Sequence, residues 1–340
     1  MVTLGISQRA LDRMAWRSNG SPATVDRLRQ GSAAMVGAAT PELATTHNFE
    51  TEEESTSEDR LRARRMRRVL NRPGRTTWLN IADRMWLLNQ SPGKMSPPLD
   101  RDAADDLATR LEDGVASGIP PATLASSLRM REIRQGLERA LLDAFEDYPD
   151  ADLMTVTVIY AGWSYTPAGL ERVTAAQVKA QFRRHLERAG VLKLPGPLLA
   201  VLHGEYEPTS GRYQLHYHLV TTVAKAAAIK AGLTAKKIRG YVKTATGSSP
   251  VRRSRIGNRI RQLSYLAKSY WPSKQVIRID GKLKRLRDHH RITEPFGTQV
   301  LLWLDRQKFS DLVLTHDCWS RRAGGTAAMK RLCLFVAGVG

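Results

Sequence analysis

Cysteine and long apolar runs are scarce in this sequence, and each scarcity excludes a class of protein. Cys318 and Cys333 are the only cysteines among 340 residues. Two isolated thiols build neither a disulfide framework nor a zinc site. No run of about eighteen apolar residues occurs, so no membrane span is expected. The chain also does not open on the basic and apolar segments of a secretory signal. These absences predict a cytoplasmic protein with no membrane partner.

Acidic residues are also in the minority. The chain has 53 Lys and Arg against 33 Asp and Glu, which gives a formal net charge of +20. An excess of this size favours a polyanionic partner, with nucleic acid the first option and an anionic membrane surface the second. With 42% apolar and 25% charged residues, the composition is that of a folded protein. The length suits two domains, or one domain with an extension.

Changes in composition divide the chain into four segments. Residues 1–58 are rich in small and polar residues and are predicted to be largely disordered. Residues 59–148 form a basic helical region that begins with the run RLRARRMRRVLNRPGR. Both DNA-backbone contact and a solvated helix face are open interpretations of this run. Residues 149–315 alternate between strand and helix patterns, and residues 316–340 are expected to be a C-terminal tail.

The third segment predicts an α+β fold. LMTVTVIY (153–160) has the alternation of a half-buried strand. A helix follows, with Thr174 as its N-cap and Gly190 as its C-terminal stop. Two strands joined by the turn PTSG (208–211) predict a hairpin. Two helices come next, the second over NRIRQLSYLAKSYW (258–271), and GTQVLLWLD (297–305) is predicted to be a strand. This order predicts an antiparallel sheet flanked by helices.

Two histidines occupy alternate positions in LHYHLV. His216 and His218 therefore share one face of the predicted strand. If Pro208 pairs with Tyr213, Glu205 lies opposite His216, with His203 opposite His218. A slip of one residue on each side of the turn would bring Glu207 there instead.

The combination suits a divalent ion. Two imidazoles and one carboxylate leave open positions on Mg or Mn. Structural histidines without a ligand are the alternative interpretation.

A tyrosine and a lysine further along have the spacing of one helix face. Tyr265 and Lys268 are separated by three residues. A phenol with a pKa of about 10 becomes a nucleophile only where a cation or a metal favours its phenolate. Lys268 is positioned to do that, or to hold a phosphate under attack. A half-buried tyrosine with a packing role is the alternative.

Together these motifs resemble the HUH endonucleases, in particular the replication initiators of rolling-circle plasmids and phages. LMTVTVIY is similar to the first motif of that family, LHYHLV to its histidine–hydrophobe–histidine motif, and YLAK to its Tyr-x-x-Lys motif. GEYE stands where the family has an acidic third ligand. The resemblance covers roughly residues 150–310. It implies a nuclease core with an antiparallel, ferredoxin-like or RRM-like sheet, preceded in this chain by a helical N-terminal extension.

The resemblance also implies a reaction. Tyr265 would attack a phosphodiester in single-stranded DNA at a replication origin, leaving a 5′-phosphotyrosine and a free 3′-OH. His216, His218 and Glu205 would hold Mg or Mn, and Lys268 would stabilise the transition state. Two nucleophilic tyrosines are not expected, because Tyr270 lies five residues after Tyr265 and points elsewhere. No GxxxxGK[ST] loop is present, so a host helicase and DNA polymerase are expected partners.

Basic residues bracket the predicted nucleophile. Residues 251–291 contain thirteen Lys and Arg against two Asp. The residues expected to bind DNA are Arg252, Arg253, Arg255, Arg259, Arg261, Lys282, Lys284 and Arg285. A non-catalytic, basic DNA-binding regulator and a transposase with the same core are the competing interpretations.

Overall fold

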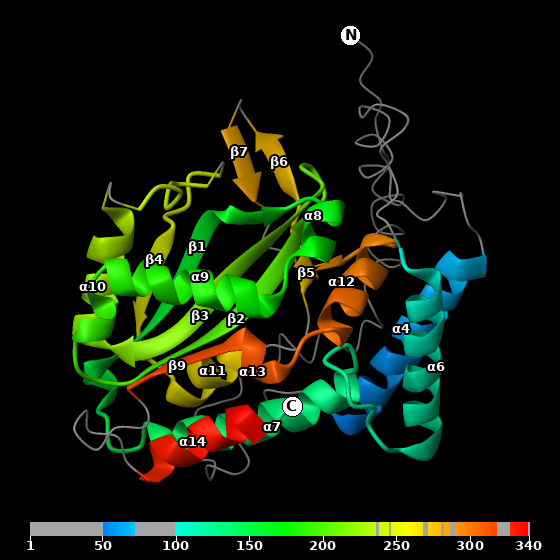
Figure 1. Ribbon diagram of the computed structural model, residues 1–340, viewed down its shortest axis with the longest axis horizontal. Helices are drawn as coiled ribbons and strands as arrows, with labels where there is room; N and C mark the ends of the chain where they lie inside the picture. Colours follow the sequence, from blue (N-terminus) through cyan, green and yellow to red (C-terminus); the bar gives the residue numbers. More distant parts are fainter. Residues whose placement is uncertain are drawn as a thin grey trace. The chain divides into compact units, whose positions relative to one another are not determined.

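The chain folds into a mixed α+β structure, shown as a computed structural model in Figure 1. The structure describes residues 50–71, 99–235, 238–244, 246–267, 271–279, 282–285, 290–317 and 327–338. The described residues belong to one compact unit. None of the described helices is long and apolar enough to cross a membrane.

Ten α-helices and three short 3-10 helices are described. The α-helices are α4 (Glu52–Asn71), α6 (Arg101–Ser117), α7 (Ser127–Ala144), α8 (Pro167–Arg172), α9 (Ala175–Arg188), α10 (Val223–Thr234), α11 (Arg259–Ser264), α12 (Phe296–Asp305), α13 (Phe309–Leu312) and α14 (Ala327–Gly338). The 3-10 helices are η1 (Asp150–Asp152), η2 (Val191–Lys193) and η3 (Tyr265–Ala267).

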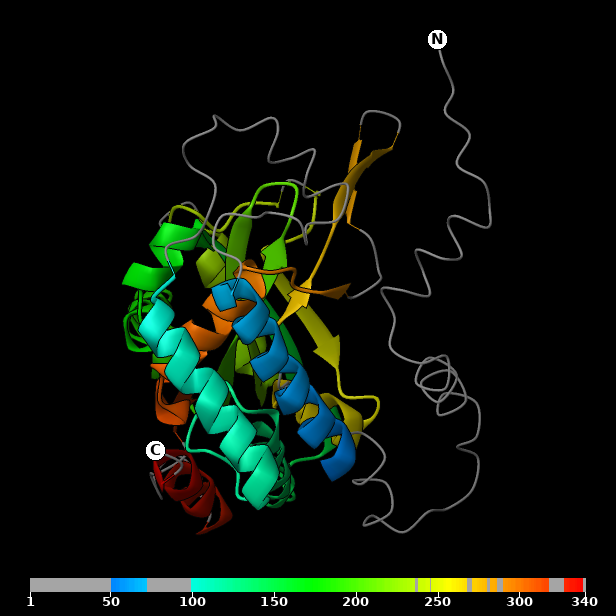
Figure 2. The same ribbon diagram turned by 90° about the vertical axis from the view of Figure 1, so that its right-hand side faces the viewer.

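Nine strands are described in two sheets. They are β1 (Leu153–Tyr165), β2 (Leu198–Glu207), β3 (Arg212–Thr222), β4 (Val251–Arg255), β5 (Pro272–Ser273), β6 (Val276–Ile279), β7 (Lys282–Arg285), β8 (His290–Arg291) and β9 (Val313–His316). The large sheet has the order β4-β1-β3-β2-β5-β8, and β9 also pairs with β2. Strands β6 and β7 pair only with each other and stand away from the large sheet as a separate arm (Figure 2).

The α+β class is confirmed, but the expectation of a wholly antiparallel sheet is wrong. Strand β5 runs parallel to β2, pairing Ser273 with Tyr206. The path of the chain explains this, because the ring of Trp271 lies directly against Gly204 of β2. A Cβ atom added at Gly204 would lie 2.4 Å from that ring. The missing side chain therefore lets the segment before β5 approach β2 closely and run beside it.

The β2–β3 hairpin has the predicted turn but not the predicted pairing. Glu207 pairs with Arg212 across the four-residue turn 208–211, so His203 rather than Glu205 lies opposite His216. The register is displaced by two residues, which keeps every side chain on the predicted face. The Glu207 carboxylate accepts hydrogen bonds from the backbone N–H groups of Thr209 and Ser210, both at 2.8 Å. These bonds close the turn at this register.

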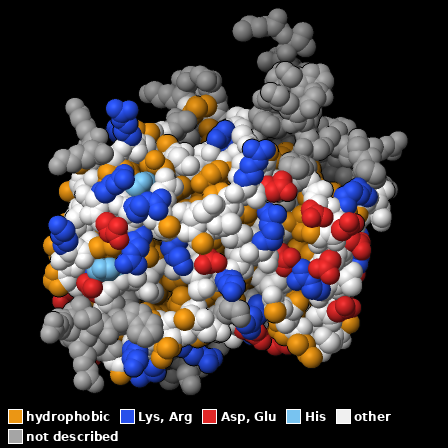
Figure 3. Space-filling model, viewed as in Figure 1, with side chains coloured by type: hydrophobic (Ala, Val, Ile, Leu, Met, Phe, Trp, Pro, Cys, Tyr) orange, Lys and Arg blue, Asp and Glu red, His pale blue; other side chains and the backbone are white. Residues whose placement is uncertain are grey.

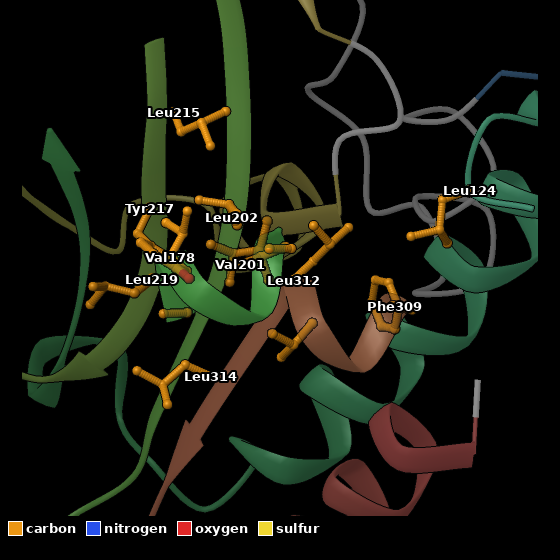
Figure 4. Close-up of a cluster of buried hydrophobic side chains, with 14 of the residues drawn as sticks. Leu124, Val178, Val201, Leu202, Leu215, Tyr217, Leu219, Phe309, Leu312 and Leu314 are labelled. Atoms are coloured by element: carbon orange, nitrogen blue, oxygen red, sulfur yellow. The ribbon is translucent and has the colours of Figure 1, made fainter. Parts of the chain in front are cut away.

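One face of the sheet builds the apolar core. Leu215, Tyr217 and Leu219 alternate along β3 and are fully buried, and the Tyr217 ring stacks on Phe182 of α9 at 4.3 Å. Figure 4 shows these β3 side chains together with Val178 of α9. Burying a side chain of this size contributes about 1.5–3 kcal/mol. The core fixes which face of β3 turns inward, and so leaves His216 and His218 on the other face.

The caps predicted for the helix after β1 are confirmed. Thr174 and Gln177 form a reciprocal capping box at the start of α9. Gly190 has a φ of 73°, the left-handed conformation that ends a helix and favours glycine.

A helical layer formed by α4, α6, α7 and α14 packs beside the sheet (Figures 1 and 2). Helix α4 begins at Glu52, seven residues before the predicted basic region. Residues 52–58 are therefore helical rather than disordered as predicted, and Glu52, Glu53 and Glu54 form the first turn of α4, where carboxylates stabilise the positive end of the helix dipole. Asp59 of α4 is buried and accepts hydrogen bonds from the Ser126 hydroxyl and from the N–H groups that begin α7.

Three local predictions need correction. GTQVLLWLD is helix α12 rather than a strand; an apolar run of this length does not by its pattern distinguish a buried helix from a buried strand. The helix predicted over residues 258–271 ends at Ser264 and continues as η3. The expected C-terminal tail contains α14, which packs against α7; the Phe335 ring fills the space left by Gly136.

Candidate functional site

A cleft of about 390 Å³ lies on the sheet face opposite α9, bordered by α11 and η3. It is lined by Thr155, Val156, Thr157, Ile159, Glu205, His216, His218, Leu219, Arg252, Arg261, Gln262, Tyr265, Leu266, Lys274 and Arg285. Seven of these were predicted as site residues: Glu205, His216, His218, Tyr265, Arg252, Arg261 and Arg285. The structure thus brings together these seven predicted residues, which lie up to 80 positions apart in the sequence.

The alternation of side chains along each strand places several cleft residues on the same face of the sheet. His218 pairs with Thr157 of β1, and Thr157 in turn pairs with Arg252 of β4. Because paired residues in neighbouring strands share a face, these three side chains project from the same side of the sheet. His216, two residues before His218, projects from that side as well.

The two histidines face each other through their ring nitrogens. His216 Nε2 and His218 Nε2 are 3.1 Å apart. His216 Nδ1 lies 3.3 Å from the backbone carbonyl of Gln214, which can only accept, so the proton belongs on Nδ1 and the lone pair on Nε2. His218 Nδ1 lies 3.0 Å from the Thr157 hydroxyl. Either a proton or a cation must therefore lie between the two Nε2 atoms, because two lone pairs at this distance repel.

The separation of the pair also fits a shared metal ion. Two nitrogens, each about 2.1 Å from one cation, are about 3.0–3.4 Å apart at ordinary bond angles. Histidine ligands typically donate their other ring N–H to an oxygen, and both rings have such a partner here. Within the described part of the chain, no group of three or more His, Cys, Asp and Glu side chains is arranged to hold a metal. The fit therefore extends to two ligands, His216 and His218.

Glu205 reaches the cleft but is engaged by two cations. Its carboxylate, 3% exposed, is 2.9 Å from Lys274 Nζ and 2.6 Å from Arg285 Nη1. Burial alone would raise the pKa of this carboxyl, but His216, Lys274 and Arg285 outweigh it and hold the pKa at about 2. The carboxylate is therefore charged at neutral pH, with both oxygens in ion pairs.

The alternative ligand, Glu207, does not line the cleft. Its carboxylate caps the hairpin turn through Thr209 and Ser210, as described above. This role in the turn accounts for the residue without a ligand.

Tyr265 lies at the mouth of the cleft. Its side chain is 46% exposed, and its ring makes an edge contact with His218 at a centroid distance of 4.9 Å. The neighbouring residue of η3 is fixed to the sheet: His203 Nε2 donates a hydrogen bond of 2.9 Å to the Leu266 carbonyl. This bond holds the turn that carries Tyr265 over the histidine pair.

The predicted DNA-binding arginines fall into three groups. Arg252 and Arg261 line the cleft, and within the described residues no carboxylate pairs with either. Arg253 and Arg255 are exposed on β4, on the opposite face from Arg252. Arg259 is tied to the chain itself: it pairs with Asp150 at 2.6 Å and donates to the carbonyls of Phe145 and Tyr148. These bonds give Arg259 a structural role, because they anchor α11 to the end of α7; its role as a DNA contact stays a prediction.

The remaining predicted cations belong to the arm or lie outside the described residues. Lys284 is exposed on β7, and Arg285 ends that strand at the edge of the cleft. Lys282 begins β7, and the position of its side chain is not described. Lys268, the predicted partner of Tyr265, lies outside the described residues, and so does Tyr270.

Four residues that shape the site were not predicted as site residues from the sequence: Thr157, His203, Gln262 and Lys274. Strand parity pointed to Thr157 and His203, which alternate with core residues on β1 and β2. Gln262 accepts from the N–H groups of Gly257 and Asn258 and donates to the Arg255 carbonyl, so it shapes the loop between β4 and α11. Nothing in the sequence pairs Lys274 with Glu205, because the contact depends on the parallel alignment of β5 with β2.

The cleft combines a pair of histidines suited to a cation, an exposed phenol in contact with that pair, and two arginines, Arg252 and Arg261, that no carboxylate of the described residues pairs with. Such a set can bind an anionic group, orient it towards an oxygen nucleophile and stabilise added negative charge. No protein-family model, curated protein or solved structure matches the chain. The function therefore has to be derived from the residues of the cleft.

Proposed function

We propose that the protein is a metal-dependent endonuclease of the HUH type that nicks and rejoins single-stranded DNA through Tyr265, in the role of a rolling-circle replication initiator. One observation carries the proposal: the exposed Tyr265 ring contacts His218, whose Nε2 meets His216 Nε2 at 3.1 Å in a cleft that Arg252 and Arg261 also line.

The arrangement of the core strands supports the proposal. Strands β1 to β4 and helices α9 and α10 follow one another as strand, helix, strand, strand, helix, strand. The four strands lie in the order β4-β1-β3-β2, and each runs antiparallel to its neighbours in this order. This order of elements supports the ferredoxin-like or RRM-like core that we propose from the resemblance to HUH endonucleases. The parallel strand β5 is an addition at the edge of that core.

The proposed reaction exchanges one phosphodiester bond for another, so the energy of the broken bond is kept in the new one. The Tyr265 oxygen attacks phosphorus as its proton leaves, the bond from phosphorus to the 3′ oxygen breaks, and that oxygen takes up a proton. The products are a 5′-phosphotyrosine and a free 3′-OH, and attack by a 3′-OH reverses the step. A phosphodiester linkage replaces another, which makes rejoining possible without an energy source.

The residues of the cleft have distinct parts in this step. Arg252 and Arg261 attract the phosphate and stabilise its growing charge. His216 and His218 would hold Mg or Mn, which would supply Lewis-acid polarisation of the phosphate when bound. Thr157 and the Gln214 carbonyl orient the two rings. Lys268, three residues after Tyr265, is proposed to favour its phenolate. Origin DNA, a host helicase and a host polymerase are the proposed partners.

Covalent trapping tests the proposal. The protein is incubated with Mn and single-stranded oligonucleotides from the DNA around its own gene, and products are separated on a denaturing gel. We expect a protein–DNA adduct with the wild type and none with Tyr265→Phe, which loses one oxygen and keeps the ring. Tyr165→Phe, a change at the end of β1 away from the cleft, is the matched control and should retain the adduct. DNA binding without any adduct in the wild type would favour the regulator interpretation.

A further inference from the structure

The residues at the two ends of the β6–β7 arm form ion pairs with one buried carboxylate, that of Glu205. The two strands pair from Val276 with Arg285 to Ile279 with Lys282 and have no strand partner in the large sheet. Lys274 lies just before the first strand and Arg285 ends the second. Both contact Glu205, at 2.9 and 2.6 Å. Figure 2 shows the arm projecting from the body of the molecule.

The ion pairs at Glu205 differ from ordinary surface pairs. Glu205 is 3% exposed, whereas Lys274 and Arg285 are 18% and 28% exposed. A carboxylate buried to this degree is costly unless cations and donors surround it. Removal of its charge leaves two cations without their shared partner, at the point where both strands of the arm join the body. One further bond attaches the arm, from the Thr209 hydroxyl to the Val276 carbonyl at 2.8 Å.

The arm has the surface chemistry of a strand-binding element. Lys284 is exposed and lies directly across from Ile277, an exposed aliphatic side chain. A cation beside an apolar side chain suits the phosphate and the base of a single-stranded nucleotide. At the base of the arm, the Nε–H of Arg285 is buried and has no hydrogen-bond acceptor within the described residues. An unused donor at the wall of a cleft favours an anionic ligand.

We propose that Glu205 is a positioning residue that anchors the β6–β7 arm, and that the anchored arm forms one wall of a binding surface for a single-stranded polynucleotide. This proposal deepens the proposed nuclease function and rests on it for the identity of the strand. It gives Glu205 a role other than that of a third metal ligand. The anchor holds Lys274 and Arg285 at the cleft edge, so a strand bound in the cleft continues along the arm.

Hydrogen–deuterium exchange of the free protein tests the anchor without metal or DNA. Glu205→Gln keeps the shape of the side chain and removes its charge. We expect amide exchange in β6 and β7 to accelerate on the order of tenfold or more, since charge-assisted bonds at the base are lost, while exchange in β1 and β3 stays unchanged. Glu187→Gln, which breaks an exposed ion pair on α9, is the matched control. Unchanged exchange in the arm of Glu205→Gln would overturn the anchor.

Oligonucleotide binding tests whether the anchored arm is part of a binding surface. Glu205→Gln has two effects on the affinity for a single strand, and they have opposite signs. Removing one negative charge from the cleft favours a polyanion, and Glu187→Gln measures that effect on the opposite side of the sheet. Loss of the anchor disfavours binding. We expect Glu205→Gln to bind a single-stranded oligonucleotide several-fold more weakly than wild type, and Lys284→Ala to lower the salt slope by about one. Tighter binding by Glu205→Gln, or an unchanged salt slope for Lys284→Ala, would overturn the proposal that the arm binds the strand.

Manganese binding separates this proposal from the third-ligand role. We expect Glu205→Gln to retain Mn affinity within about twofold, because His216 and His218 are untouched, as measured by the loss of the free Mn electron paramagnetic resonance signal. A large loss of Mn affinity with an unchanged arm would make Glu205 a ligand and overturn the anchor. If the wild type forms no covalent adduct yet the arm responds as expected, the nuclease proposal fails and the anchor stands.

Discussion

Arginine serves opposite purposes in the helical layer and in the cleft. In α4, Arg67 contacts Asp105, Thr109 and Glu112 of α6, and Arg62 donates to the Ala125 carbonyl and pairs with Glu58. In the cleft, Arg252 and Arg261 have no carboxylate partner within the described residues. Arg62 and Arg67 therefore connect α4 to its neighbours, whereas Arg252 and Arg261 are available to bind an anion.

The supply of carboxylates explains the difference. Helix α6 has Asp102, Asp105, Asp106, Glu112 and Asp113 in seventeen residues, and Figure 3 shows acidic side chains gathered on that side of the molecule. Residues 251–291 contain only two Asp against thirteen Lys and Arg. A basic run in a sequence therefore indicates a nucleic-acid surface only where the fold does not place acidic residues against it. In the run at residues 60–68, Arg62 and Arg67 are paired with acidic residues, so these two arginines do not indicate a nucleic-acid surface.

The largest expected effect lies on the cleft side of the comparison. Replacing both His216 and His218 with alanine should lower the nicking rate by about a thousandfold or more, because the pair that holds the ion is gone. Affinity for single-stranded DNA should change less than about threefold, since the arginines supply it. Nicking rate and equilibrium binding measured on the same oligonucleotide provide the check. Wild-type nicking that is indifferent to EDTA would contradict the metal-binding role.

Much of this site was predictable because strand parity is a short-range property. Alternation in LHYHLV and LMTVTVIY placed His216 and His218 on one face, and a two-residue displacement of the hairpin left that face unchanged. The partner of Glu205 was not predictable. It depends on the register of the turn and on Gly204, which together bring Lys274 and Arg285 to the carboxylate through contacts distant in the sequence.

The fold shows the same division between local and distant causes. The capping box at Thr174 and the turn PTSG follow from a few neighbouring residues and are confirmed. Helix α12 was mistaken for a strand, because burial on nearly all sides removes the polar face that gives a helix its period. The structural role of Arg259 depends on carbonyls more than 100 positions away.

On the helical side, Asp59 is expected to have the next largest effect, and on stability rather than activity. Its buried carboxylate caps α7 through Ser126, Ser127 and Leu128. Asp59→Ala should lower the free energy of unfolding by about 2–4 kcal/mol, because several charge-assisted bonds at a helix start are lost together. Urea denaturation measures the loss. Asp105→Ala, at an exposed pair with Arg67, is the control and should cost less than about 1 kcal/mol.

Glu138 gives the helical layer a pH-dependent contribution to stability. It is buried in α7, and neither of its carboxyl oxygens has a hydrogen-bond partner within the described residues. Burial raises the pKa of Glu138 to about 7, against nearby Arg134 and Arg139, which lower it. The folded state therefore holds this proton more tightly than the unfolded state does. Its contribution to stability is complete below about pH 4.5 and is lost as the pH rises through 7.

The measurable consequence is a slope in stability between pH 5 and 8. In the wild type, the unfolding free energy should fall by roughly 1–3 kcal/mol across that range because of Glu138. Glu138→Gln should not show this fall. Urea denaturation of both proteins at several pH values tests this. Parallel pH profiles for wild type and Glu138→Gln would assign the slope to other groups.

The smallest expected effect compares the two kinds of arginine directly. Arg252→Ala should lower the slope of log affinity against log salt by about one, because one phosphate contact is lost. Arg67→Ala removes the same charge from the protein, but Asp105 and Glu112 already neutralise that guanidinium, so the slope should stay as in wild type. Titrations with one single-stranded oligonucleotide at four salt concentrations resolve a difference of this size. Equal reductions in both variants would mean that DNA responds to net charge alone. A reduced slope only in Arg67→Ala would place the DNA on the helical layer instead of the cleft.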